Sequence, residues 1–268
     1  MVHRSATHAG SWYTSSRQAE TTEETQDWRK VAMPVPISHC KAVIAPHVGY
    51  LYSGLTAAWA YKTIDPSVIY PLSHVYLDGC ALSGCEAYEI PLGNLEIDIQ
   101  VSSQSVSIFI FLLGHLSYLG IGAMEMDIKT DKAEHSIELH LPYVRHISKS
   151  FQTITIVPIL IGSISSEEEL IYGKVLRPYL LSPENLFVIS SDFCHCFSYT
   201  YYKDPARKLS SGASPPATPI YQSIEALDQE ALKILESLSH SEFSRYLSQT
   251  KNNICGCPVN ASQLLIVL

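Results

Sequence analysis

Four short runs of continuous apolar and β-branched residues constrain the fold of this chain more than any other feature. The runs are 41–45 (KAVIA), 68–72 (VIYPL), 153–161 (TITIVPILI) and 186–190 (LFVIS). A strand with one face in water alternates apolar and polar residues, whereas continuous apolarity predicts a strand that is buried on both faces. Such strands are typical of a parallel or mixed sheet that is covered by helices.

Helical patterns lie between and after these runs. Ser165 and Glu168 have the spacing of a capping box and predict a helix over 165–181. Apolar residues recur at helical spacing over 220–238, and a shorter helix is expected around Phe243. Because strands and helices alternate along the chain, we expect an α/β fold with a central mixed β-sheet flanked by helices.

Two stretches fit this alternation poorly. Residues 99–124 include no Asp, Glu, Lys or Arg, and they contain the apolar segment 106–118. A membrane span is one interpretation, but glycines and a histidine interrupt the segment and no basic flank frames it, so a span is the less favoured one. Residues 203–219 are rich in Pro, Ser and Ala and predict a flexible surface loop. We expect a single domain over 1–268 that carries both features.

The charge and the cysteines narrow the class of protein. The formal net charge is −8, and no basic stripe of the kind that binds phosphates is present, which disfavours a nucleic-acid surface. The seven cysteines are odd in number and thinly spread, which is typical of reduced thiols rather than of a disulfide framework. Residues 1–16 lack the apolar stretch of a signal peptide. We expect a cytoplasmic protein, with the nucleus as an additional compartment.

Three predicted strands are each followed closely by a histidine, namely His47, His74 and His195. Ligands in an open α/β sheet bind outside the carboxyl ends of the strands, so three imidazoles near one edge indicate a site. The alternative for each histidine is a buried structural role with a hydrogen-bond partner. Asp192 either orients the His195 imidazole or caps a following helix, and the two roles are compatible.

A second group of ionisable residues lies at 134–140 (EHSIELH). His135 and Glu138 share a helix face, but the spacing is not that of a zinc protease, and we expect a solvated helix start. Among the cysteines, a thiolate beside two imidazoles would form a soft site that favours copper(I), with iron(II) or zinc as alternatives. The sequence has no phosphate-binding glycine loop and no nucleophile elbow.

Nine motifs, in this order, resemble the Memo family, whose name describes a mediator of ErbB receptor-driven cell motility. They are THAGSWYT (7–14), IAPHVGYLYSG (44–54), DPS (65–67), CALS (80–83), EHSIELHLPY (134–143), VPILIG (157–162), NLFVISSDFCH (185–195), YQSIEALD (221–228) and NICG (253–256). The resemblance implies one α/β domain similar to the extradiol ring-cleaving non-haem iron dioxygenases. It also implies a pocket linked to copper or iron binding, to redox activity and to capture of phosphotyrosine-containing receptor segments.

The resemblance assigns roles to particular residues. Metal ligands are expected at His47, His74 and Cys255, and one copper(I) or iron(II) ion is the expected cofactor. Catalytic or proton-handling roles are expected at Asp192 and His195, which match the family motif SSDFCH, and His135 is expected to be a further catalytic residue. A peptide-binding pocket is expected from these aromatic, imidazole and carboxylate residues: Trp12, Tyr52, His47, Asp192 and His195.

The sequence also departs from the family pattern. The family motif GPSHH has a ligand at its first histidine, whereas this chain reads Pro-Leu-Ser-His-Val over 71–75. Ser73 matches the ligand if the following CALS motif sets the register, and His74 does if a local gap intervenes. The segment 106–118 is expected to be an insertion, and the fold is expected to lack the family's final strands.

Four hypotheses for function follow. The first is a metal-binding redox protein that acts in receptor tyrosine kinase signalling and cell motility. The second is a non-enzymatic adaptor that binds a phosphotyrosine peptide, although the pocket lacks the arginine cluster that usually binds phosphate. The third is a degenerate dioxygenase, for which a cysteine in place of a carboxylate is unfavourable. The fourth is an unstable product of a wrong gene model.

Overall fold

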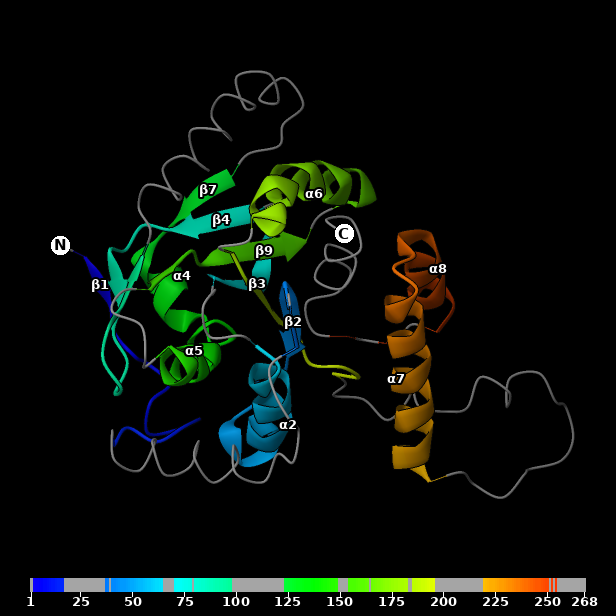
Figure 1. Cartoon of the computed structure of the whole chain (residues 1–268), viewed down its shortest axis with the longest axis horizontal. Coiled ribbons are helices and arrows are strands. Elements are labelled where there is room, and N and C mark those ends of the chain that lie inside the picture. Colours follow the sequence, from blue (N-terminus) through cyan, green and yellow to red (C-terminus); the bar gives the residue numbers. More distant parts are fainter. Residues whose placement is uncertain are drawn as a thin grey trace, which may run out of the picture.

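The computed structural model describes most of the chain, including all four apolar runs in whole or in part. The described residues are 2–16, 37–38, 40–64, 70–78, 80–97, 123–148, 154–163, 165–182, 185–195, 219–250, 252 and 254. Within them, the helices and strands form a mixed α/β fold (Figure 1). The segment 106–118 and residues 203–218 of the expected loop lie outside the described residues.

The larger of two sheets has the strand order β2-β10-β3-β9-β4-β7 among the described residues. Its strands are β2 (Ala42–Ala45), β3 (Tyr70–Asp78), β4 (Cys80–Ser83), β7 (Ala123–Met126), β9 (Ile159–Ser163) and β10 (Phe187–Ser190). The β9 and β4 strands pair in antiparallel fashion, while the other neighbours are parallel. The expectation of a central mixed sheet is therefore confirmed.

A smaller sheet has the order β1-β5-β6-β8. Its strands are β1 (His3–Arg4), β5 (Ala87–Tyr88), β6 (Leu95–Ile97) and β8 (Thr155–Ile156). The apolar run 153–161 was expected to be one strand, and this prediction is wrong. Pro158 has no backbone N–H to donate to a ladder, and the run divides there into β8 of the small sheet and β9 of the large one.

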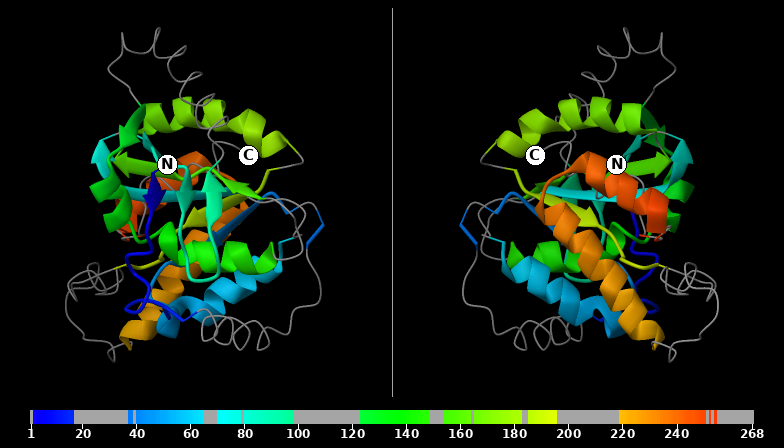
Figure 2. Two further views of the ribbon diagram at one scale, coloured as in Figure 1. Left: turned by 90° about the vertical axis from the view of Figure 1, so that its left-hand side faces the viewer. Right: turned by 90° about the vertical axis from the view of Figure 1, so that its right-hand side faces the viewer.

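Helices cover both faces of the large sheet (Figure 2). The described helices are α2 (Tyr50–Lys62), α4 (Ile128–Ala133), α5 (Leu141–Ile147), α6 (Ser166–Leu181), α7 (Ile220–Glu236) and α8 (His240–Thr250), and a short 3-10 helix, η1 (Glu138–His140), precedes α5. The α6 helix lies on one side of the sheet, and α2 and α5 lie on the other. Leu180 of α6 packs in a cluster with Phe187 of β10.

The three helices expected from the sequence are confirmed. The capping box of α6 is formed: the Ser165 side chain accepts the Glu168 N–H, and the Glu168 carboxylate accepts the Ser165 N–H at 2.6 Å. The α7 helix ends at Glu236, two residues earlier than expected, and Leu238 adopts a left-handed φ of 53°. Phe243 anchors α8 in a cluster that also includes Ile44 of β2, which places α7 and α8 beside that edge of the sheet (Figure 1).

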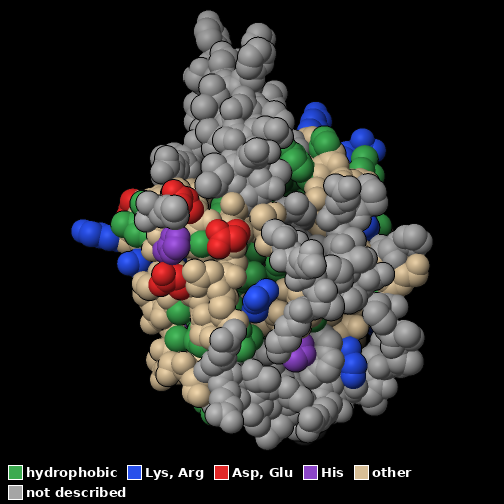
Figure 3. All heavy atoms as spheres, turned by 60° about the vertical axis from the view of Figure 1, so that its left-hand side comes forward, with side chains coloured by type: hydrophobic (Ala, Val, Ile, Leu, Met, Phe, Trp, Pro, Cys, Tyr) green, Lys and Arg blue, Asp and Glu red, His purple; other side chains and the backbone are tan. Residues whose placement is uncertain are grey.

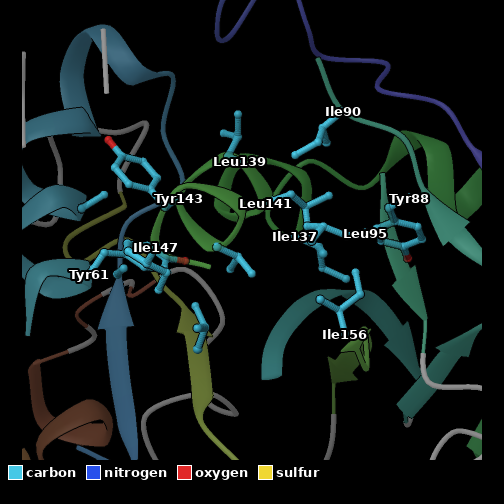
Figure 4. Packing of buried hydrophobic residues seen from close by; sticks show 14 of the residues in the cluster. Tyr61, Tyr88, Ile90, Leu95, Ile137, Leu139, Leu141, Tyr143, Ile147 and Ile156 are labelled. Atoms are coloured by element: carbon cyan, nitrogen blue, oxygen red, sulfur yellow. The ribbon is translucent and has the colours of Figure 1, made fainter. Parts of the chain in front are cut away.

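The main core lies between α2 and the small sheet, and the segment 137–147 runs through it. Figure 4 shows its side chains reaching Tyr61 of α2 on one side and Leu95 of β6 on the other. The Tyr61 and Tyr143 rings are stacked with centroids 4.9 Å apart. Tyr50 donates its hydroxyl proton to the Leu139 carbonyl at 2.7 Å, which ties α2 to the start of this segment.

The surface agrees with the charge composition. On the face drawn in Figure 3, the described Lys and Arg side chains are scattered and acidic side chains lie among them. Within the described part of the chain, no helix combines the length and the apolarity that a membrane span requires.

Candidate functional site

The site lies at the carboxyl edge of β2 and β10, the residues 46–49 and 191–195 that follow these parallel strands. Ala45 and Ser190 are in register at the strand ends, so His47 and Asp192 each lie two residues beyond. The Asp192 carboxylate accepts the His47 backbone N–H through Oδ1 at 2.9 Å. Its Oδ2 lies 3.4 Å from Nε2 of the His47 ring. Both side chains are buried, so the carboxylate and the imidazole lie close together and are shielded from solvent.

Asp192 therefore orients the residues that follow β2. The described residues 193–195 after it form a turn and include no helix start for it to cap. The Asp192 carboxylate accepts backbone N–H groups of His47 and Val48, which belong to the neighbouring strand connection. Burial raises the pKa of Asp192 above its ordinary value, while these N–H groups and the nearby His195 oppose the rise. The raised pKa makes a proton on this carboxyl easier to hold than on a solvated aspartate.

The His47 ring is fixed on its other side as well. Its Nδ1 lies 2.6 Å from the hydroxyl oxygen of Ser190, the last residue of β10. His140 approaches the same hydroxyl through Nε2 at 2.9 Å, and its Nδ1 lies 2.8 Å from the Tyr61 hydroxyl. The spacing of EHSIELH gave no sign of this contact, because His140 meets Ser190 only in the folded sheet.

His135 lies against the His47 ring and forms an aromatic cluster with the N-terminal segment. Its ring centroid is 5.5 Å from that of His47 and 4.8 Å from that of Trp12. His8 lies 5.9 Å from both His135 and Trp12. Burial lowers the pKa of His135, and positive charge on His8 or His195 lowers it further, so this imidazole is held in its neutral form.

The expectation of a solvated helix start at 134–140 is wrong. Within this segment the buried polar side chains are Glu134, Ser136, Glu138 and His140. Arg4 of β1 is fully buried and pairs with Glu138 at 2.8 Å and with Asp131 at 3.1 Å. Its guanidinium also lies 4.9 Å from the centroid of the Tyr88 ring. The carboxylates of Asp131 and Glu138 can be buried because the guanidinium of Arg4 compensates their charge. Arg4 lies more than 120 residues earlier in the sequence.

Glu138 also holds the N-terminal segment, residues 7–14, beside the site through hydrogen bonds. Its Oε1 accepts the His8 backbone N–H at 2.8 Å and the Tyr13 hydroxyl at 3.0 Å. The intervening turn places Trp12 against His135. This arrangement, like the contacts of Arg4, was missed from the sequence. The THAGSWYT motif was the available signal, since it marks the segment that Glu138 holds.

The remaining predicted residues are placed to different extents. His195 is half-buried and lies near enough to Asp192 and His135 to affect their pKa values. Tyr52 of α2 is 79% exposed, while Trp12 is 38% exposed. His74 lies inside β3 rather than after a strand, because β3 continues to Asp78. The side chain of His74 and the whole of Cys255 lie outside the described residues.

The described side chains alone do not complete a metal site. Among them, no group of three or more His, Cys, Asp or Glu residues has a geometry that could hold a metal ion. Of the expected metal ligands, His47 is the one whose side chain is described. The carboxylate of Asp192 lies next to its ring and offers an oxygen beside the imidazole nitrogen. The chemistry of this pair, an imidazole nitrogen beside a carboxylate oxygen, is compatible with a cation, while the other expected ligands, His74 and Cys255, have no described side chain.

Comparisons with known proteins agree with the motifs. The family model described as Memo-like protein matches residues 4–267. Protein MEMO1 from Danio rerio is 41% identical over 266 residues, covering 96% of this chain and 81% of the relative. Protein MEMO1 from Homo sapiens is 40% identical with the same coverage, and Protein memo-1 homolog from Caenorhabditis elegans is 36% identical over 94% of this chain and 68% of the relative. The chain belongs to the Memo family.

Proposed function

We propose that this chain is a cytoplasmic redox protein that binds one copper(I) or iron(II) ion at the carboxyl edge of β2 and β10. The observation that carries the proposal is the buried approach of His47 Nε2 to Asp192 Oδ2, at 3.4 Å. Nitrogen and oxygen atoms of these types are metal-ligating groups, and their ring and carboxylate are held in place by further hydrogen bonds.

The other ligands of the proposed site are His74 and Cys255. Leu72 of β3 is in register with Ile189 of β10, so the backbone of His74 reaches the level of Ser191 beside the same edge. That position supports the assignment of His74 in preference to Ser73, whose hydroxyl is a poor ligand for a soft metal ion. Cys255 enters the proposal through the NICG motif that it shares with the family.

A bound copper or iron ion would supply one-electron exchange at this edge. The residues of the chain would orient the ion and handle protons around it. Asp192 can hold a proton at Oδ2, because burial raises its pKa. The neutral His135 ring lies against the His47 ring, and Trp12 of the N-terminal segment lies against His135 in turn. In the cell, we propose a role for this activity in receptor tyrosine kinase signalling and motility.

The test is an anaerobic copper(I) competition titration of the purified chain against a chelator of known affinity. We expect one equivalent to bind, and we expect His47→Ala and Cys255→Ser each to weaken binding at least tenfold. Cys40→Ser is the matched control, because Cys40 precedes β2, at the end of that strand opposite the proposed site, and its thiol contacts the Ala42 carbonyl. Absence of binding by folded wild-type protein, shown by circular dichroism, would refute the proposal.

A second candidate function is docking of a phosphotyrosine peptide beside the same edge. The exposed parts of Trp12 and Tyr52 favour it, because aromatic side chains that remain accessible are common anchors for peptides. Arg4 does not support phosphate recognition, since it is buried and paired with two carboxylates. Saturable binding of a phosphotyrosine peptide that Trp12→Ala abolishes would support this function. Equal affinity for the unphosphorylated peptide would contradict phosphate recognition.

A further inference from the structure

A buried chain of hydrogen bonds runs from α2 to the proposed ligand His47 and links it to three side chains that the proposed metal ligation does not use. It passes from the Tyr61 hydroxyl to His140, from His140 to Ser190 and from Ser190 to His47. The four residues come from α2, η1, β10 and the segment after β2, and all four are buried. The Ser190 hydroxyl makes a further contact, with the Ser136 carbonyl at 3.0 Å.

The position of the protons in this chain follows from the Ser136 carbonyl. A carbonyl oxygen only accepts, so the single hydroxyl proton of Ser190 is donated to it. The two imidazole nitrogens next to the Ser190 oxygen must then both donate to its lone pairs. His140 thus carries a proton on Nε2 and accepts the Tyr61 proton at Nδ1, while His47 carries a proton on Nδ1.

This assignment has a consequence on the opposite side of the His47 ring. A neutral imidazole protonated at Nδ1 has an acceptor lone pair at Nε2. That lone pair lies 3.4 Å from Asp192 Oδ2, which is also an acceptor when the carboxyl is ionised. A cation, either a proton or a metal ion, that lies with these two buried acceptors removes the repulsion between them.

We propose that Ser190, supported by His140 and Tyr61, is a positioning residue that fixes His47 in its Nδ1–H tautomer and so presents Nε2 to the metal ion. The second half of this statement rests on the proposed metal-binding function. The first half is a property of the protein without metal and holds or fails independently. Ligating histidines in proteins are commonly oriented in this manner through the nitrogen that does not bind the metal.

The first arm of the test measures copper(I) affinity in the competition assay. Ser190→Ala removes the oxygen that accepts from His47, and we expect it to weaken binding about 10- to 100-fold, the range typical of outer partners of metal ligands. Ser190→Thr retains the hydroxyl and is expected to restore most of the affinity. Ser148→Ala is the matched control, because Ser148 at the end of α5 is equally buried and its hydroxyl donates to the local Arg145 carbonyl at 3.2 Å.

The second arm uses no metal and requires no variant of Ser190. Long-range proton–nitrogen NMR spectra of the histidine-labelled, metal-free chain distinguish a protonated from an unprotonated ring nitrogen, and His47→Gln assigns the signals of His47. We expect a protonated Nδ1 and an unprotonated Nε2. The opposite tautomer would overturn the proposal, as would wild-type copper(I) affinity in Ser190→Ala. A wild-type chain that binds no copper but shows the expected tautomer would refute the metal function and the presentation of Nε2 to a metal, while leaving the tautomer assignment intact.

Discussion

Replacing Glu138 with glutamine tests how the candidate site is held together. The carboxylate lies 2.8 Å from Arg4 Nη1 through Oε2, and it accepts the His8 N–H and the Tyr13 hydroxyl through Oε1. Glutamine keeps the shape but replaces one oxygen with an N–H donor. In one orientation the new donor faces the guanidinium of Arg4, and in the other it faces the His8 N–H. Neither orientation preserves all the hydrogen bonds.

The expected loss of stability is large. Breaking a buried ion pair by neutralising one partner costs about 3–5 kcal/mol, because the remaining charge stays buried without full compensation. Arg4 keeps its second partner, since Asp131 lies 3.1 Å away, so we expect the lower end, about 3 kcal/mol. Domains of this kind are stable by about 5–15 kcal/mol, so this loss is a substantial share of the total.

Urea unfolding followed by circular dichroism measures this loss through the shift of the midpoint at constant slope. Glu242→Gln is the matched control, because Glu242 pairs with Arg245 at 3.8 Å on the exposed surface of α8. An exposed pair contributes about 0–1 kcal/mol, so this variant should unfold close to the wild type. If Glu138→Gln also unfolds within about 1 kcal/mol of the wild type, the argument from buried charge is wrong.

Three further predictions concern other parts of the fold. Ser165→Ala removes the cap of α6 and should cost about 1 kcal/mol in urea unfolding, and an unchanged midpoint would contradict the role of the capping box. Phe243→Ala should cost about 3–5 kcal/mol because the ring is fully buried, whereas Leu51→Ala on the exposed face of α2 should be neutral; equal losses in the same assay would be unexpected. Burial raises the pKa of Glu134 from its ordinary 4.5 to about 7. Between these values the folded state binds more protons than the unfolded state, so this group lowers stability as pH rises through that window, by about 3 kcal/mol in all. Glu134→Gln should remove this part of the loss of stability with rising pH. If the urea midpoints of Glu134→Gln follow the same pH dependence as those of the wild type, the raised pKa of Glu134 is refuted.

Local signals in the sequence predicted the elements whose stability is decided locally. The runs 41–45 and 186–190 became the neighbouring strands β2 and β10. All four residues of β10 are buried, as uninterrupted apolarity predicts, whereas in β2 buried and half-buried residues alternate. The α6 helix begins at its capping box, because the cap is complete within four residues. The helix α2 was missed, and here the local signal is weak: its exposed side includes Leu51 and Tyr52, so apolar residues lie on both faces.

The site was predicted where it depends on position along a strand and missed where it depends on a distant partner. His47 and Asp192 follow strands whose ends are in register, and the sequence places both at one edge. Arg4 and Glu138 each look like ordinary surface charges in isolation. Nothing in the spacing of either segment indicates that they pair, because the pairing depends on the small sheet that brings β1 beside β5.

The segment 134–140 joins two polar networks of the described residues, and this explains why so many ionisable groups are buried there. Glu138 meets Arg4 and the N-terminal segment, while His140, two residues later, meets Ser190 beneath the site. Between them, Leu139 is buried in the core and its carbonyl accepts the Tyr50 hydroxyl. A short 3-10 turn can present successive side chains in such different directions. The position of His135 over His47 is thus fixed by contacts on both sides of the turn, so the stability of the fold and the geometry of the site depend on the same buried charges.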